Sequence, residues 1–231
     1  MSDILSKRIK QSVILCGGAD APDLGQIASL LNQYQATAFI GVDRGGLKLI
    51  EAGYDLDYAV GDFDSVTSQE LHTIDTHSQK LERHSSMKDD TDMELALELA
   101  IEEYPEADYY IFGGIGEQQG RLDHLFANVW LVFQPRYLAV IDRLQFIEAN
   151  HMIKFYKPGQ HQITADPETH FLSLISLTAM KQLSIQFAKY NLEAVDIPYP
   201  RALISNEFID QQTVQIAFEE GVLMVMWVEE A

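Results

Sequence analysis

Two carboxylates, Asp62 and Asp64, stand one residue apart, directly after the apolar run at residues 58–60. The run is typical of the end of a β-strand, and in an extended backbone residues i and i+2 point to the same side. The spacing therefore predicts a pair of hard oxygen donors that could bind a divalent cation such as Mg²⁺. A structural alternative exists, because Asp64 and Ser65 also suit a turn and a helix cap before a predicted helix at residues 67–74. The short motif alone does not decide between them.

A second acidic group opens the helix whose apolar periodicity is clearest, residues 92–104. Its apolar residues follow i, i+3, i+4, i+7, i+8 and i+11: Met93, Ala96, Leu97, Ala100, Ile101 and Tyr104. Thr91 and Glu94 have the spacing of a capping box, and acids in a first turn complement the helix dipole. The three acids within residues 89–92 exceed what capping requires, so we predict a site role for Asp92.

A third polar group lies at the start of a predicted helix over residues 122–133. We expect its buried face to consist of Leu122, Leu125, Phe126 and Val129. Arg121, His124 and Asn128 would share the opposite side, and an arginine at a helix start can hold phosphate oxygens with two hydrogen bonds. The alternatives are that Asp123 is an ordinary first-turn acid and His124 an ordinary buried histidine.

Composition excludes several classes of protein and site. The net charge of −19, from 35 acidic and 16 basic residues, disfavours nucleic acids and anionic membranes as partners. Cys16 is the only cysteine, which excludes an intrachain disulfide and a thiolate-rich zinc site. No apolar run approaches the ~20 residues of a membrane-spanning helix, and the first ten residues lack a signal-peptide pattern, so we expect a cytoplasmic protein. The sequence contains no Walker P-loop, kinase glycine loop or Rossmann fingerprint.

The elements that must position these residues alternate along the first part of the chain. Strand-like runs occupy residues 13–16, 38–42, 58–60, 109–112 and 138–141. Helical spacing occurs between them at residues 24–33, 47–51, 92–104 and 122–133. The alternation predicts an α/β domain over residues 1–143, with a mostly parallel sheet that helices cover on both faces. Polar clusters follow residues 16, 42, 60 and 112, and active sites in such sheets lie beyond the carboxyl ends of the strands.

The last third of the chain has a different pattern. Short strand-like runs, among them residues 171–177 and 222–228, are separated by turns, and no long amphipathic helix is evident. This pattern predicts an all-β sandwich domain over residues 144–231.

Together, five segments of this sequence resemble the thiamin pyrophosphokinase family, in the family's order and over most of the chain. They are residues 43–46 (DRGG), 61–65 (GDFDS), 91–92 with the preceding acids, 120–124 (GRLDH) with Asn128, and 204–207 (ISNE). The resemblance implies the two domains above and a homodimer that binds thiamin where its chains meet. It also implies transfer of pyrophosphate from ATP to the hydroxyl of thiamin, with Mg²⁺ as cofactor.

The resemblance implies a role for each matching residue. The metal site would consist of Asp43, Asp62, Asp64 and Asp92, of which Asp62, Asp64 and Asp92 would be catalytic. The ATP site would add Thr91 and Arg121. The charges of Arg44 and Lys88 make them candidate contacts for the triphosphate, and the alternative for each is a solvated surface charge. The thiamin site would consist of Asp123, His124, Asn128, Ser205 and Asn206. Asp92 could accept the hydroxyl proton or only hold the metal.

Two other functions remain open from the residues alone. One is a Mg²⁺-dependent phosphohydrolase that uses Asp62 and Asp64 with water. The other is a nucleotide-sensing module without catalysis, whose β domain binds a protein partner.

Overall fold

The computed structural model describes residues 10–18, 22–85, 87, 89–115, 122–165 and 169–229. The chain forms two compact units, Met1–Leu131 and Val132–Ala231, whereas the sequence predicts a boundary between residues 143 and 144. Among the helices in these described ranges, we find none with the length and apolar character needed to span a membrane.

The first unit contains a parallel sheet. Its strands lie in the order β5 (Asp108–Phe112), β1 (Gln11–Cys16), β2 (Ala36–Val42), β3 (Leu56–Gly61) and β4 (Ser78–Arg83). In the register of the sheet, Cys16 at the end of β1 lies opposite both Gly41 and Phe112. The carboxyl ends of β5, β1 and β2 therefore meet at one edge, as the alternation of elements predicts.

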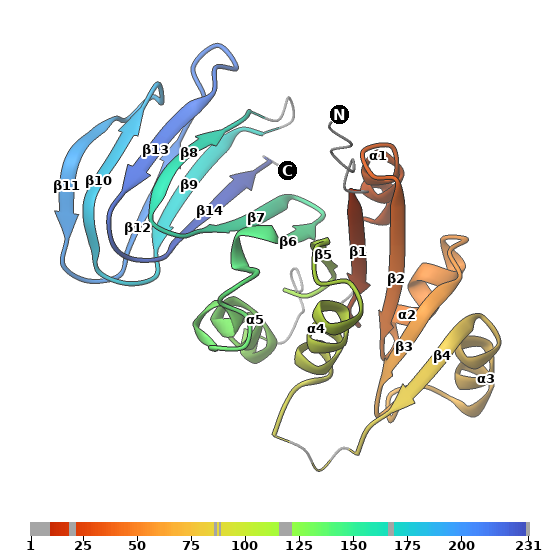
Figure 1. Ribbon diagram of the computed structural model, residues 1–231. Helices are drawn as coiled ribbons and strands as arrows, with labels where there is room; N and C mark the ends of the chain where they lie inside the picture. The colour runs from red at the N-terminus through yellow and green to blue at the C-terminus, as the bar shows by residue number, and fades with distance from the viewer. Residues whose placement is uncertain are drawn as a thin grey trace, which may run out of the picture. The chain divides into compact units, whose positions relative to one another are not determined.

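Helices cover both faces of this sheet, which confirms the predicted α/β fold. They are α1 (Ile27–Leu31) after a short 3-10 turn η1 (Leu24–Gln26), α2 (Gly45–Glu51), α3 (Ser68–Thr76) and α4 (Asp92–Glu103). A further helix, α5 (Leu122–Trp130), follows β5. Figure 1 shows α4 on one side of the strands and α2 and α3 on the other. The apolar residues of α4 that face the sheet are those that its periodicity predicts: Met93, Ala96, Leu97 and Ala100.

The predicted buried face of α5 is wrong in part. Leu122 is 71% exposed and Phe126 51% exposed, while Asn128 on the same helix is buried. Asn128 is turned inward because its side-chain amide donates a hydrogen bond to the carbonyl of Gly114. The spacing of apolar residues shows that a helix has an apolar face, but it does not show what covers that face.

The predicted strand at residues 138–141 is also wrong. The backbone N–H groups of Tyr137, Val140 and Arg143 each bond to the carbonyl three residues earlier, so the segment forms consecutive turns that end in η3 (Ile141–Arg143). Val140 and Ile141 are nevertheless buried. Burial, rather than strand formation, explains the apolar residues of this run. Conversely, the apolar pattern does not predict β4, because its sequence SQKLER has a single apolar residue. β4 is an edge strand, and such a strand can form with few buried side chains.

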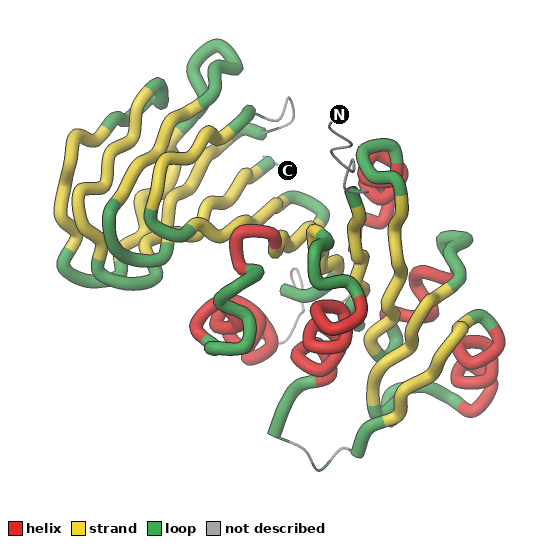
Figure 2. The backbone as a smooth tube through the Cα atoms, in the orientation of Figure 1, coloured by secondary structure: helices red, strands yellow, loops and turns green. Residues whose placement is uncertain are grey.

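The second unit is a sandwich of two antiparallel layers, as predicted. One layer has the order β12 (Arg201–Asn206), β9 (Phe171–Ser176), β14 (Leu223–Val228), β7 (His151–Tyr156) and β6 (Leu144–Glu148). The other has the order β11 (Leu192–Ile197), β10 (Met180–Gln186), β13 (Val214–Phe218) and β8 (Gly159–Ile163). Figure 2 shows strand following strand in this unit, where the first unit alternates strands with helices. Apolar residues of both layers form one core, which includes Leu174, Ile185 and Trp227.

Candidate active site

Three carboxylates meet at the carboxyl edge of the parallel sheet. Asp43 follows β2, Asp62 follows β3 and Asp92 begins α4, and each offers an oxygen within 4.8 Å of those of the other two. All three residues are half-buried. We call Asp43, Asp62 and Asp92 the acid trio. Three oxygen donors at this separation match the ligands that Mg²⁺ prefers in proteins.

The backbone at the ends of β2 and β3 fixes the first member of the trio. Asp43 has a φ of +49°, and its N–H donates to the carbonyl of Val60 at 3.0 Å. Its carboxylate accepts a hydrogen bond from the N–H of Phe63 at 3.2 Å. Gly61 leaves room for this arrangement, because a Cβ there would lie 2.0 Å from Oδ1 of Asp43. Steric exclusion of a side chain therefore explains the glycine of the GDFDS segment.

Asp64 lies outside the acid trio. Strand β3 ends at Gly61, and Phe63 has a φ of +59°, so the backbone is not extended between the two acids. Instead, the N–H of Asp64 donates to Oδ1 of Asp62 at 3.0 Å, and the Asp64 side chain is exposed. The extended geometry that the i, i+2 spacing predicted is therefore wrong, while a metal-binding role for Asp64 stays a prediction.

The third member of the trio is not needed to cap its own helix. Thr91 caps α4, since its hydroxyl accepts a hydrogen bond from the N–H of Glu94 at 3.2 Å. Glu94 completes the capping box by accepting from the N–H of Thr91 at 2.7 Å. Helix capping, the structural alternative for this segment, is thus the role of Thr91 and Glu94. Capping does not require the Asp92 side chain, which belongs to the trio.

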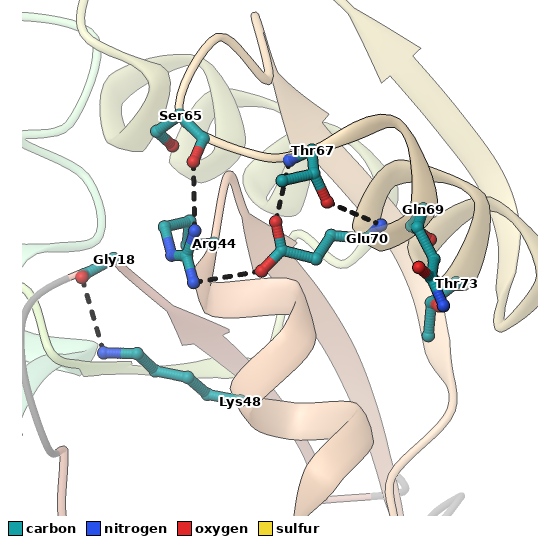
Figure 3. A network of polar contacts seen from close by, with 8 residues as sticks. All are labelled: Gly18, Arg44, Lys48, Ser65, Thr67, Gln69, Glu70 and Thr73. Carbon is teal, nitrogen blue, oxygen red and sulfur yellow. Dashed lines mark hydrogen bonds and ion pairs between the residues drawn. The ribbon is translucent and has the colours of Figure 1, made fainter.

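Two cations, Arg44 directly before α2 and Lys48 within it, bind carbonyl groups of neighbouring loops (Figure 3). Arg44 donates to the carbonyl of Ser65 at 3.0 Å and to a carboxylate oxygen of Glu70 at 3.2 Å. Lys48, one turn further along, donates to the carbonyl of Gly18 at 3.4 Å. The pKa of Glu70 is lowered, first by the hydrogen bond from the N–H of Thr67 and further by Arg44. Glu70 is therefore ionised at neutral pH.

The glycines after β1 and β5 allow backbones to approach closely. The N–H of Gly17 donates to the carbonyl of Phe112 at 2.8 Å, and a Cβ on Gly17 would lie 2.5 Å from the carbonyl oxygen of Gly113. A Cβ on Gly45, at the start of α2, would lie 1.8 Å from the carbonyl oxygen of Cys16. Packing at the sheet edge therefore accounts for these glycines without a phosphate ligand.

The second unit holds the remaining pair of predicted site residues. Asn206 is buried, and its side-chain oxygen accepts hydrogen bonds from the N–H groups of Tyr190 at 2.9 Å and Glu207 at 3.0 Å. Its side-chain amide donates to the carbonyl of Tyr190 at 2.9 Å. Asn206 thereby ties the end of β12 to the turn between β10 and β11. Ser205 is exposed and has a φ of +60°.

Comparisons with known proteins agree with both units. The model of the thiamin pyrophosphokinase catalytic domain matches residues 29–141, and that of the thiamin pyrophosphokinase vitamin B1 binding domain matches residues 160–223. A thiamine pyrophosphokinase of Bacillus subtilis is 32% identical over 192 residues, covering 82% of this chain and 86% of the relative. The chain belongs to the thiamin pyrophosphokinase family. This membership supports the same enzymatic function for the chain.

Solved structures of the thiamin pyrophosphokinase family share the fold. A family protein from Enterococcus faecalis has a TM-score of 0.86 at 34% identity, covering 95% of this chain and all (100%) of that one. The thiamine pyrophosphokinase of Bacillus subtilis has a TM-score of 0.81 at 29% identity, covering 96% of this chain and 100% of its own.

The structure brings together only part of the site that the family resemblance implies. Asp43, Asp62 and Asp92 meet, and Arg44 and Asp64 lie next to them in sequence. Asp123 and His124 are exposed on α5, where the N–H of His124 donates to the carboxylate of Asp123 at 3.1 Å. The ordinary buried histidine is therefore excluded for His124. Lys88 and Arg121 lie outside the described residues.

Tyr190, which the sequence did not single out, lies next to the buried Asn206. Its backbone N–H and carbonyl are both held by Asn206, while its side chain is 59% exposed. The available signal was an aromatic residue between two polar ones, Lys189 and Asn191.

Proposed function

We propose that the chain transfers the β,γ-pyrophosphoryl group of ATP to the hydroxyl of thiamin, which gives thiamin diphosphate and AMP. The acid trio carries this proposal, because it forms an oxygen-rich site at the sheet edge of a chain that also matches a vitamin B1 binding domain. In the reaction the hydroxyl oxygen forms a bond to the β-phosphorus, and the bond between that phosphorus and the AMP oxygen breaks. The hydroxyl proton leaves, and AMP carries away the electron pair of the broken bond.

The residues of the trio fit Mg²⁺. All three donors are carboxylates, and their separation allows one ion to bind an oxygen from each. Asp43, Asp62 and Asp92 would hold the ion, which when bound neutralises charge on the phosphate oxygens. We assign the exposed Asp64 to the metal that arrives with the nucleotide, because it borders the trio without joining it.

The protein's own residues position the reactants and take up the proton. We propose Asp92 as the carboxylate that receives the hydroxyl proton, in addition to its contact with metal. For ATP we retain Arg44, Thr91, Lys88 and Arg121 as candidate contacts. Proper placement of the hydroxyl against the β-phosphorus supplies much of the catalysis in reactions of this class.

Candidate contacts for thiamin lie on α5 in the first unit and, separately, in the second unit. Asp123, His124 and Asn128 of α5 stay candidate contacts, and Ser205 offers an exposed hydroxyl. The thiazolium ring of thiamin carries a positive charge, for which the exposed ring of Tyr190 is a suitable face. We further propose a homodimer, as the family resemblance implies, and a cytoplasmic location.

An assay of both products tests the function. The protein is incubated with ATP, Mg²⁺ and thiamin, and AMP and thiamin diphosphate are quantified with and without thiamin. We expect equal amounts of both products, and none when thiamin is omitted. Phosphate release without thiamin would support the phosphohydrolase alternative instead. Tight ATP binding with no product at all would support the sensing module.

A further inference from the structure

We propose that Arg44 is a positioning residue, which holds the turn at residues 62–67 so that the Asp62 carboxylate faces the metal. This inference rests on the proposed function. It gives Arg44 a structural task in addition to the candidate contact with ATP proposed above. Two observations support it: the contacts that Arg44 makes with Ser65 and Glu70, and the backbone conformation of the turn that these contacts hold.

Arg44 joins three elements through one guanidinium group. It stands immediately before α2, and its two terminal nitrogens reach the carbonyl of Ser65 and the carboxylate of Glu70 on α3 (Figure 3). The planar group of arginine suits two acceptors at fixed positions, whereas a lysine ammonium is a single point charge. Ser65 directly follows Asp64, so the contact acts on the backbone of the acidic turn itself.

That turn has a backbone conformation that benefits from external support. Phe63 has a φ of +59°, in the left-handed region that non-glycine residues disfavour. Its N–H donates to Asp43, and the next N–H, that of Asp64, donates to Asp62. The conformation of this turn therefore sets the position of two carboxylates of the acid trio at once.

The partner of Arg44 is itself fixed. Glu70 uses its other carboxylate oxygen to accept from the N–H of Thr67 at 2.7 Å, within the capping box of α3. An exposed ion pair alone contributes little to stability. Here, however, the pair adds a hydrogen bond to a loop carbonyl and connects two helices to the turn. Arg44 thus gives two of its five N–H donors to protein acceptors on the turn and on α3.

The direction of the change in divalent-cation affinity distinguishes a positioning role of Arg44 from a purely electrostatic one. Removal of a positive charge beside three carboxylates should by itself strengthen the binding of a divalent cation, because repulsion between the cations is removed. Loss of a brace should weaken that binding, because the Asp62 carboxylate is no longer held. The Arg44→Ala variant therefore distinguishes the two by the direction of the change.

The test measures Mn²⁺ binding by electron paramagnetic resonance, with no nucleotide present. We expect Arg44→Ala and Glu70→Gln each to weaken binding roughly 3- to 10-fold, a change of about 0.7–1.4 kcal/mol. Glutamine at position 70 can keep the capping box of α3 but loses the ion pair. The double variant should be no weaker than Arg44→Ala, because both changes break the same contact. Thermal unfolding shows that each variant is folded.

Lys48→Gln is the matched control, since it removes one positive charge from α2, about one helical turn after Arg44. We expect unchanged or slightly tighter Mn²⁺ binding for it. Unchanged or tighter binding for Arg44→Ala would overturn the inference. So would an Arg44→Ala defect confined to the KM for ATP at saturating Mg²⁺, absent from Glu70→Gln, because it would mark a phosphate ligand.

Failure of the proposed function has a different signature. A wild-type protein that binds no Mn²⁺ overturns the metal site and this inference with it. A wild-type protein that binds Mn²⁺ but forms no thiamin diphosphate overturns only the reaction, and the order of affinities among the variants still decides the role of Arg44.

Discussion

At the scale of single residues, Asp62 and Asp64 have different surroundings although one residue separates them. Asp62 is half-buried in the acid trio, and Asp64 is exposed. Phe63, between them, has a left-handed backbone conformation. The N–H of Asp64 donates to Asp62, so the second acid also helps to orient the first. The difference gives each carboxylate a separate experimental signature.

We expect Asp62→Asn to abolish Mn²⁺ binding in the absence of nucleotide, whereas Asp64→Asn should retain it. Both variants should reduce turnover by about 10²-fold or more, because bound metal supplies several kcal/mol of transition-state stabilisation. Electron paramagnetic resonance and the AMP assay measure the two quantities. Equal loss of nucleotide-free binding in both variants would place Asp64 among the primary ligands.

Single residues also show where sequence reasoning reaches its limit. The types and order of Asp43, Asp62 and Asp92 predicted an acidic site, because carboxylates at the ends of parallel strands converge. The hydrogen bonds of Asn206 could not be predicted, since its partner Tyr190 is distant in sequence and the pairing depends on how two turns meet. The same reason kept Arg44 from being paired with Glu70.

At the scale of elements, the hairpin of β10 and β11 contains a carboxylate with a displaced pKa. Asp196 accepts hydrogen bonds from Lys181 at 2.8 Å and from the N–H of Gln182 at 3.0 Å. These contacts, the one from Lys181 first, lower the pKa of Asp196 from 3.8 to about 2. A lowered pKa means that the folded state binds the proton less well than the unfolded state does.

The contribution of Asp196 to stability is therefore present above about pH 4, and it is lost as the pH falls toward about 2. We expect Asp196→Asn to flatten the dependence of the unfolding free energy on pH within that window. Urea unfolding at several pH values measures it. An unchanged slope between wild type and variant would contradict the assignment. Because the residue is exposed, we expect a small effect.

Elements were predictable where burial and periodicity agree. The apolar positions of α4 face the sheet, and the runs at residues 13–16 and 109–112 form buried strands, because a buried element needs an apolar side. The prediction failed where burial and apolar periodicity disagree. The apolar residues at 140–141 are buried in a turn, and those at 122 and 126 are exposed on a helix.

At the scale of the whole molecule, the net charge of −19 affects how the protein would attract or repel the proposed substrates, anionic MgATP and cationic thiamin. MgATP is negatively charged, so the protein as a whole repels it, and salt screens that repulsion. We expect kcat/KM for ATP to rise roughly 2- to 5-fold between about 10 mM and about 150 mM KCl. Steady-state kinetics at saturating Mg²⁺ and thiamin measure it. A fall over this range would show that local cations dominate.

The acid trio has a consequence for the protein when no metal is bound. Three half-buried carboxylates within 4.8 Å of one another repel, and the fold must hold them together against that repulsion. In EDTA, we expect Asp62→Asn to raise the unfolding temperature by about 1–4 °C, which corresponds to roughly 0.5–1 kcal/mol. Calorimetry measures the shift, and a lower unfolding temperature would contradict it. The residues that we propose for catalysis would then limit the stability of the metal-free protein, a trade-off between activity and stability located in three side chains.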